Sequence, residues 1–454
     1  MKESGSISRR NFLKTTAAAG GAMVAAGPIM SFASTRKTNQ KMRIALVGTG
    51  VRGVGMYGQR LLSDYGNYVD MVGICDSNPG RLRYAHDYIK PGGKAYTDLE
   101  DMLKSTKPEW LIVTSWDWEH HNHFITGMKH GCNIICEKPL TIDEHKAQMI
   151  LDAEKKYGKE IIVTFNYRWP PHRAKVKQLI MDGMIGDITS VDFHWNLDKG
   201  HLMQYMRRWH GEAARGGTLW VHKATHHFDM INWYLDSDPE EVFAYADLEQ
   251  FGESGPFRGV NCRNCAHKDK CPAYWDITRS DHLMRMYVDN EKYDGYIRDN
   301  CVYRKQIDVY DKHSAVVKYA NNAYLNYSLT GDTDHSGFWL AFNGTKGRIE
   351  GREGGWSEDE KNYMEWNVQP LGKDPQIIRV PPTEGGHWGG DPLMNDKLFK
   401  DQTQPDPLQQ AAGVRDGVMS VLAGVAARKS VESGKPVKIA GLTTLVPQAK
   451  RPSP

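Results

Sequence analysis

The chain has 454 residues, of which 25% are charged and 40% hydrophobic, with 58 Lys and Arg against 55 Asp and Glu. The length predicts two to three domains, and the near balance of charge argues against a nucleic-acid-binding face. The sequence contains no run of 18 apolar residues, so we expect no membrane span, and its seven Cys are too few for a disulfide scaffold.

Residues 1–34 are predicted to be a twin-arginine (Tat) signal peptide. Arg9 and Arg10 precede a weakly apolar run, 15–26, and small residues near Ala33 offer a cleavage site. Because no Cys follows the apolar run, no lipid anchor is expected. We therefore expect the Tat machinery to export the folded protein to the periplasm, and a cofactor can travel inside it.

A G-x-G-x-x-G motif at 48–53 follows a predicted strand, 42–48, and precedes a predicted helix that runs through residue 62. Glycines in such a turn let the backbone approach a pyrophosphate, and the helix N-terminus favours its charge. A second strand, 69–75, ends at Asp76, whose carboxylate can bind the ribose hydroxyls of an adenosine. These features favour NAD as cofactor, while Arg81 leaves NADP as an alternative.

Strands and helices alternate over the predicted domain 41–166. Apolar strands are expected at 110–114, 133–136 and 161–165, with helices between them. This alternation predicts a Rossmann-type, doubly wound parallel sheet, with its ligand at the carboxyl ends of the strands. The residues that we expect to bind the cofactor there are Gly48, Gly50, Val51, Arg52, Gly53, Asp76, Ser115, Trp116, Glu137 and Asn166.

The run C-E-K-P at 136–139, after a glycine motif at this spacing, resembles the Gfo/Idh/MocA oxidoreductase family. The resemblance implies an α/β fold, in which the Rossmann domain is followed by an α+β domain with an open, largely antiparallel sheet. We assign this substrate-binding domain to 167–440 and a tail, disordered from 447 onward, to 441–454. The resemblance also implies that Lys138 is catalytic, and a lysine beside a cationic nicotinamide has a lowered pKa.

Two further segments resemble motifs of this family. The segment 166–170 is similar to the one that closes over the cofactor, which implies contacts from Asn166 and Arg168, although Arg168 could equally form a structural ion pair. The family's G-G-x-x-x-x-D-x-x-x-H signature matches 216–226, which implies that His226 is the general base. The signature's Asp is replaced by His222, beside Lys223, and we expect one of these two to contact a sugar hydroxyl; His222 and His226 could also bind a metal.

The second half is predicted to carry strands at 188–197, 315–329 and 338–342, helices at 225–235 and 409–433, and an insertion at 250–305. The four cysteines of the insertion could bind a structural zinc ion or an Fe–S cluster, form two disulfides, or remain free thiols; they are Cys262, Cys265, Cys271 and Cys301. Substrate contacts are expected from the aromatic and loop residues Tyr167, Trp220 and His387.

These residues predict an NAD-dependent dehydrogenase that acts on a secondary hydroxyl of a sugar or glycoside, with C3 as the expected position. Because free NAD is not expected outside the cytoplasm, we expect it to be tightly bound. The run 116–118 resembles an exported branch of NAD-dependent glycosidases (N-acetylgalactosaminidases), so oxidation, elimination, hydration and reduction form one alternative. A non-catalytic sugar-binding protein is another. A homo-oligomer is plausible for a fold with an open sheet face.

Overall fold

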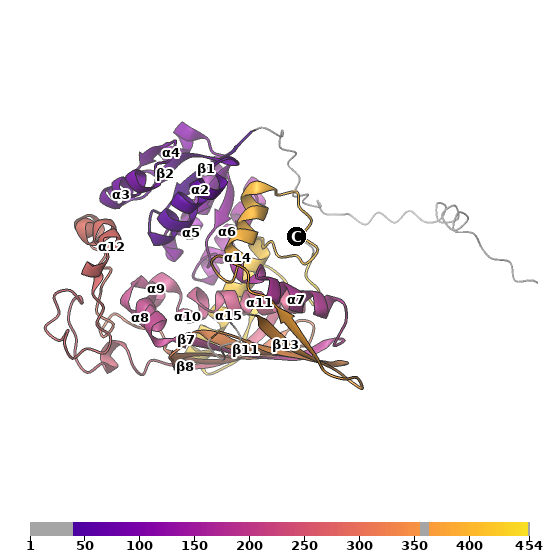
Figure 1. Ribbon diagram of the computed structural model, residues 1–454. Coiled ribbons are helices and arrows are strands. Elements are labelled where there is room, and N and C mark those ends of the chain that lie inside the picture. Colours follow the sequence, from indigo (N-terminus) through magenta and orange to yellow (C-terminus); the bar gives the residue numbers. More distant parts are fainter. Residues whose placement is uncertain (1–39, 355–362, 453–454) are drawn as a thin grey trace, which may run out of the picture. The chain divides into compact units, whose positions relative to one another are not determined.

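The computed structural model describes residues 40–354 and 363–452, so the predicted signal peptide lies outside the described residues. Its first sheet, to which the strands labelled β1 and β2 in Figure 1 belong, has six parallel strands in the order β3-β2-β1-β4-β5-β6. This order confirms the predicted Rossmann sheet. The strands are β1 (Met42–Val47), β2 (Val69–Cys75), β3 (Lys94–Tyr96), β4 (Trp110–Val113), β5 (Asn133–Cys136) and β6 (Ile161–Val163).

Buried strands and capped helices explain why this region folds as a parallel sheet. All four residues of β4 are buried, as expected for a strand covered on both faces. Asn78 caps the helix after β2 by accepting hydrogen bonds from the amides of Gly80 and Arg81, and Asp143 caps the helix after β5. The helical segments are η1 (Gly53–Arg60), α2 (Leu61–Tyr65), α3 (Pro79–Ile89), α4 (Leu99–Thr106), η2 (Asp117–Glu119), α5 (His120–Lys129) and α6 (Glu144–Tyr157).

The second sheet has nine strands in the order β14-β13-β12-β11-β7-β10-β9-β8-β15. Only the pair β7–β10 is parallel among these described strands, so the sheet is largely antiparallel, as predicted. The strands are β7 (Ile188–Asp198), β8 (Pro239–Asp247), β9 (Lys312–Tyr319), β10 (Tyr324–Thr333), β11 (Gly337–Gly344), β12 (Gly347–Glu353), β13 (Met364–Pro370), β14 (Gln376–Val380) and β15 (Val437–Lys438).

One predicted strand, 315–329, is in fact the hairpin β9–β10. Asn322 adopts a positive φ of 68° in the turn, which an asparagine tolerates, and the amide of Ala323 donates to the Asn321 side chain. Because both strands of the hairpin alternate buried and exposed side chains, the turn is hidden in one continuous pattern.

Helices cover one face of the second sheet (Figure 1). The long helix α15 packs on α11, on β8, and also on β6 and α6 of the Rossmann region. The helical segments of this half are η3 (Asn166–Arg168), α7 (Pro171–Met181), α8 (Lys199–Arg207), η4 (Trp209–Gly211), α9 (Ala213–Gly216), α10 (Leu219–His222), α11 (Thr225–Leu235), η5 (Gly252–Ser254), η6 (Ile277–Arg279), α12 (Asp281–Met286), η7 (Val288–Asn290), α13 (Glu291–Asp294), α14 (Gly390–Asn395), η9 (Asp396–Lys400), α15 (Val414–Ser433) and η10 (Ile439–Gly441).

The predicted disorder from residue 447 onward is wrong for the residues that the structure describes there. The amide of Gln448 donates to Asp238 at 2.9 Å, and Arg451 forms ion pairs with Asp238 at 3.0 Å and with Asp416 at 2.7 Å. A buried aspartate therefore fastens the end of the chain to the second half. None of the helices in 40–354 and 363–452 has the length and apolarity needed to cross a membrane.

Candidate active site

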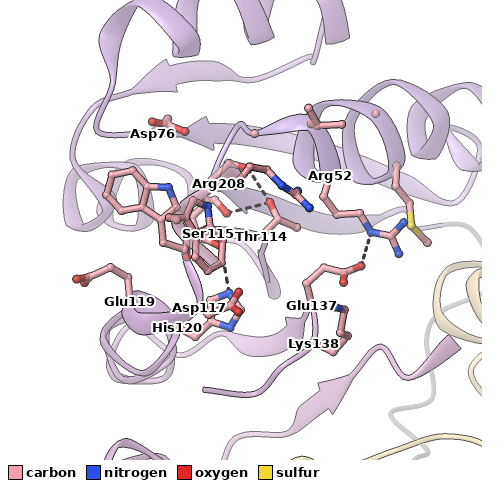
Figure 2. A pocket seen from close by; sticks show the side chains of 18 of the residues that line it. Arg52, Asp76, Thr114, Ser115, Asp117, Glu119, His120, Glu137, Lys138 and Arg208 are labelled. Atoms are coloured by element: carbon pink, nitrogen blue, oxygen red, sulfur yellow. Dashed lines mark hydrogen bonds and ion pairs between the residues drawn. The ribbon is translucent and has the colours of Figure 1, made fainter. Parts of the chain in front are cut away.

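A cavity of about 1030 Å³ contains most of the predicted site residues (Figure 2). It begins at the glycine turn after β1 and extends to side chains of α8, α10 and α11 in the second half. The predicted residues that line it are Gly48, Gly50, Val51, Arg52, Asp76, Ser115, Trp116, Glu137, Lys138, Asn166, Tyr167, His222, Lys223, His226 and His387.

The glycines at 48 and 53 let the turn pack closely against the neighbouring backbone. Gly48 has a φ of +94°, and a Cβ atom there would lie 2.4 Å from the amide nitrogen of Ser115. At Gly53 a Cβ atom would lie 2.1 Å from the carbonyl oxygen of Gly48, so this glycine allows the helix to pack on the strand. Gly53 is not among the residues that line the cavity, and its contact with the cofactor stays a prediction.

Asp76 is held rigidly at the end of β2. Its carboxylate accepts hydrogen bonds from the Thr49 amide at 2.8 Å, the Thr49 hydroxyl at 2.9 Å and the Asn78 amide at 2.8 Å. Arg81 lies 3.3 Å from Asp76 and 2.8 Å from Asp294, so two carboxylates already neutralise the cation that kept NADP as an alternative. A carboxylate in this position fits a ribose with free hydroxyls and repels a 2′-phosphate.

Lys138 lies on the loop after β5. Its ammonium group donates to the carbonyl oxygen of His222 at 3.2 Å, whereas the neighbouring Glu137 pairs with Arg52 at 2.6 Å. Burial lowers the pKa of Lys138 to about 8, and the charges of Asp117 and Glu137 oppose that shift. Lys138 and the glycine turn thus line one cavity, and the lysine exchanges a proton more readily than one at the surface.

A pairing between His222 and Asp117 was not predicted from the sequence. Nδ1 of His222 lies 2.5 Å from Oδ2 of Asp117, which comes from η2 in the Rossmann region. Burial, together with the positive charges of His210 and Lys138, lowers the pKa of His222 well below its usual value. Burial also raises the pKa of Asp117. The carboxylate that is missing at position 222 is therefore present nearby, contributed by a loop 105 residues earlier.

His226 is placed mainly by stacking. Its ring lies 4.1 Å from the ring of Tyr167, nearly parallel to it, and its Nδ1 atom is buried without a hydrogen-bond partner among the described residues. The ammonium group of Lys223 donates to the Tyr167 hydroxyl at 3.2 Å and lies 4.7 Å from the ring centre of Trp195. Burial lowers the pKa of both His226 and Lys223.

His387 reaches the cavity from the glycine-rich loop 385–390. Its Nδ1 atom lies 2.9 Å from Asp391, and Asn166 donates to the same carboxylate at 2.7 Å. Asp391 also lines the cavity and was not predicted as a site residue, although it directly follows this loop in the sequence.

Comparisons with known proteins agree with this architecture. Residues 42–165 match the family model "Oxidoreductase family, NAD-binding Rossmann fold", and residues 177–439 match "Oxidoreductase family, C-terminal alpha/beta domain". The chain belongs to the Gfo/Idh/MocA oxidoreductase family. Residues 6–26 match the twin-arginine translocation signal sequence, so the predicted export signal is confirmed.

Relatives of this family member include sugar-active proteins. The putative oxidoreductase YteT of Bacillus subtilis is 33% identical over 420 residues, which cover 87% of this chain and 97% of the relative. The D-glucoside 3-dehydrogenase of Escherichia coli is 26% identical over 153 residues, which cover 33% of this chain and 42% of the relative. A structure of levoglucosan dehydrogenase with NADH and levoglucosan superposes with a TM-score of 0.63 at 17% identity, covering 88% of this chain and 100% of the other.

Two residues expected in the site of this Gfo/Idh/MocA protein lie in the core. Arg168 is 2% exposed and pairs with Asp229 at 2.5 Å and Asp416 at 2.7 Å, so it forms a structural ion pair and does not line the cavity. Trp220 is fully buried against Phe228 and does not line the cavity, so its predicted role as a substrate contact is wrong. Arg168 follows the cavity residue Tyr167 and Trp220 lies two residues before the cavity residue His222, but both side chains are buried in the packed interior.

The structure does not support the metal site that was one alternative for the insertion cysteines. Within 40–354 and 363–452, no group of three or more His, Cys, Asp or Glu side chains is arranged to hold a metal ion. The four insertion cysteines are free thiols around a cavity of about 10 Å³. The guanidinium group of Arg207 donates to the Sγ atom of Cys262 at 2.7 Å and to the carbonyl oxygen of Ala273 at 2.6 Å.

Proposed function

We propose that the protein is an NAD-dependent dehydrogenase that oxidises a secondary hydroxyl of a sugar or glycoside, at C3. One observation carries this proposal: a single cavity is lined both by Gly50 and Asp76, which are expected to bind a nucleotide, and by Lys138 and His222, which can transfer protons. The similarity to D-glucoside 3-dehydrogenase supports the position of oxidation.

The residues of the cavity fit a nicotinamide dinucleotide. The glycine turn would hold the diphosphate, and Asp76 would accept hydrogen bonds from the ribose hydroxyls of the adenosine. When bound, the nicotinamide supplies the acceptor for the hydride that leaves the carbinol carbon. Because the protein is exported, we propose that it keeps this nucleotide tightly bound.

Proton transfer is assigned to the side chains at the other end of the cavity. Lys138, as an ammonium group, holds the reacting hydroxyl oxygen and stabilises the negative charge that develops on it. His222 accepts the hydroxyl proton on Nε2, because its Nδ1–H group donates a hydrogen bond to Asp117, with 2.5 Å between Nδ1 and Oδ2, which orients the ring. His226 has no comparable partner that fixes its tautomer among the described residues, which is why we assign it substrate contact instead of the base role suggested by its position in the family motif.

Aromatic side chains provide apolar faces for a sugar ring. Tyr167, Trp116 and Trp209 line the cavity, and Trp116 stacks on Trp118 with ring centres 4.6 Å apart. Flat rings cover the C–H faces of a pyranose, while the basic side chains around them bind its hydroxyl groups.

One assay separates the candidate functions. The purified protein is incubated with a 4-nitrophenyl glycoside, first without added nucleotide and then with an artificial electron acceptor. Accumulation of a 3-keto glycoside in the presence of the acceptor is the expected result. Release of nitrophenol over many turnovers without an acceptor would instead establish the redox-neutral glycosidase, and no turnover by a nucleotide-loaded protein would favour a sugar-binding protein.

A further inference from the structure

Two arginines that line the cavity, Arg208 and Arg298, lack carboxylate partners in the described residues. Arg52 and Arg81 pair with carboxylates at 2.6 and 3.3 Å. Arg208 and Arg298 form no ion pair with any carboxylate in the described part of the chain. The guanidinium group of Arg208 donates to the carbonyl oxygen of Gln204, and that of Arg298 to the Tyr296 hydroxyl at 3.4 Å.

These two arginines are uncompensated charges in a confined space. Nε of Arg298 is buried and has no hydrogen-bond partner in the residues that the structure describes. Both guanidinium groups line the same cavity, and burial together with the like charge of Arg298 lowers the pKa of Arg208 to about 10. Since both line the cavity, a bound anion would relieve their repulsion and satisfy their free N–H groups.

The surroundings of Arg298 indicate which kind of anion would bind there. Its guanidinium carbon lies 5.0 Å from the ring centre of Tyr287, and the Tyr287 hydroxyl accepts a hydrogen bond from the Val51 amide at 3.0 Å. Val51 is part of the glycine turn that opens helix η1. The insertion therefore places Tyr287 against the turn at which a Rossmann fold binds a diphosphate, and Arg298 beside the ring of that tyrosine.

The same part of the insertion is fastened to helix α3. The Asn78 side chain donates to the carbonyl oxygen of Asn290 at 3.0 Å, and Arg81 pairs with Asp294 at 2.8 Å. Asn78 and Arg81 flank Asp76, the predicted ribose ligand, so the segment 281–298 extends from the adenosine end of the cavity to the glycine turn.

We propose that segment 281–298 is a clasp over the dinucleotide site, in which Arg298 and Arg208 bind the cofactor diphosphate from the side opposite the glycine turn. Two guanidinium groups match the two negative charges of a diphosphate, and arginine binds phosphate oxygens in a bidentate manner. The clasp is independent of which sugar the enzyme oxidises. It adds to the Rossmann fold a second wall that slows release of the nucleotide.

Binding measurements without sugar test this clasp. Nucleotide is stripped from the full-length mature protein, and the affinities for NAD⁺, ADP-ribose and adenosine are measured by calorimetry for the wild type, R298Q and R208Q. We expect R298Q to weaken the binding of NAD⁺ and ADP-ribose by about 10- to 100-fold and that of adenosine by less than about 2-fold, because only the first two ligands carry a diphosphate. R279Q, which alters an exposed arginine of the same insertion, should change none of the three.

A conservative variant separates a contact with the diphosphate from a general loss of folding. R298K, which keeps the charge but not the bidentate geometry, should lie between the wild type and R298Q and should keep the wild-type melting temperature. Unchanged NAD⁺ and ADP-ribose affinity in R298Q would overturn the proposal, and a raised KM for a carboxylate- or phosphate-bearing sugar would then assign the arginines to the substrate. Absence of sugar oxidation would refute the proposed function and leave these binding results intact.

Discussion

Asp76 and Arg81, at one end of the cavity, are paired with opposite charges, whereas the lysines Lys138 and Lys223, at the other end, have no carboxylate partner in the described residues. Asp76 accepts three hydrogen bonds and an ion pair, and Arg81 contacts two carboxylates. Lys138 and Lys223 donate only to a carbonyl oxygen and a tyrosine hydroxyl in the described residues, and burial lowers the pKa of each. Paired charges hold a ligand in a fixed position, while unpaired ones exchange protons near neutral pH.

The largest effect is expected at Lys138. Substitution K138M should lower kcat/KM for sugar oxidation about 1000-fold, because it removes the cation that stabilises the developing alkoxide. Bound NAD per chain should not change, since the nucleotide contacts lie at the other end of the cavity. Steady-state kinetics and nucleotide released on denaturation provide the two measurements, and K129M at an exposed lysine is the control. Equal loss of nucleotide and activity would contradict the separation of the two ends.

The Asp117–His222 pair should have the next largest effect. We expect H222N and D117N each to lower kcat about 100-fold with KM changed less than about 3-fold, because the pair acts on the proton and not on binding. The double variant should be no worse than H222N, since Asp117 works through the imidazole. H226N should mainly raise KM. If H226N instead lowers kcat more than H222N does, the base is His226, as the family motif implies.

A substitution at Asp76 tests the end of the cavity at which Asp76 and Arg81 are paired. D76N should weaken NAD⁺ binding about 10-fold, because the amide is a weaker acceptor for the ribose hydroxyls than the carboxylate. It should also improve NADP⁺ binding, since Arg81 loses one of its two carboxylates. Calorimetric titration with both nucleotides measures the change in selectivity, and D64N at an exposed position serves as control. A preference for NAD⁺ that survives in D76N would assign selectivity to other residues.

The pH dependence should give the smallest effect. Lys138 must be protonated to stabilise the alkoxide and has a pKa of about 8, so kcat/KM for oxidation should fall as pH rises through about 8. The positive charge of Lys223 contributes to lowering that pKa. K223Q should therefore move the alkaline limb upward by less than about one pH unit. An alkaline limb that moves to lower pH in K223Q would show that Lys223 does not act on Lys138 by charge repulsion.

Local patterns predicted most of the elements that surround the cavity. The expected bounds of β2, β5 and α11 agree with the structure because each is a short periodic run with a clear end. Errors arose where burial was not visible locally. Arg168 adjoins the cavity residue Tyr167 and Trp220 lies two residues from His222, yet both side chains enter the core. Among the insertion cysteines, Cys262 accepts a hydrogen bond from Arg207.

Neighbours within a few residues were enough to predict the parallel sheet, the glycine turn, the carboxylate at 76 and the lysine at 138. The carboxylate that pairs with His222 and the insertion tyrosine that contacts the glycine turn became visible only in the folded chain. Asp117 and His222 are 105 residues apart, and Arg81 and Asp294 are 213 apart. Such pairs form when the second half folds back on the Rossmann sheet, and no periodicity along the chain encodes that distance.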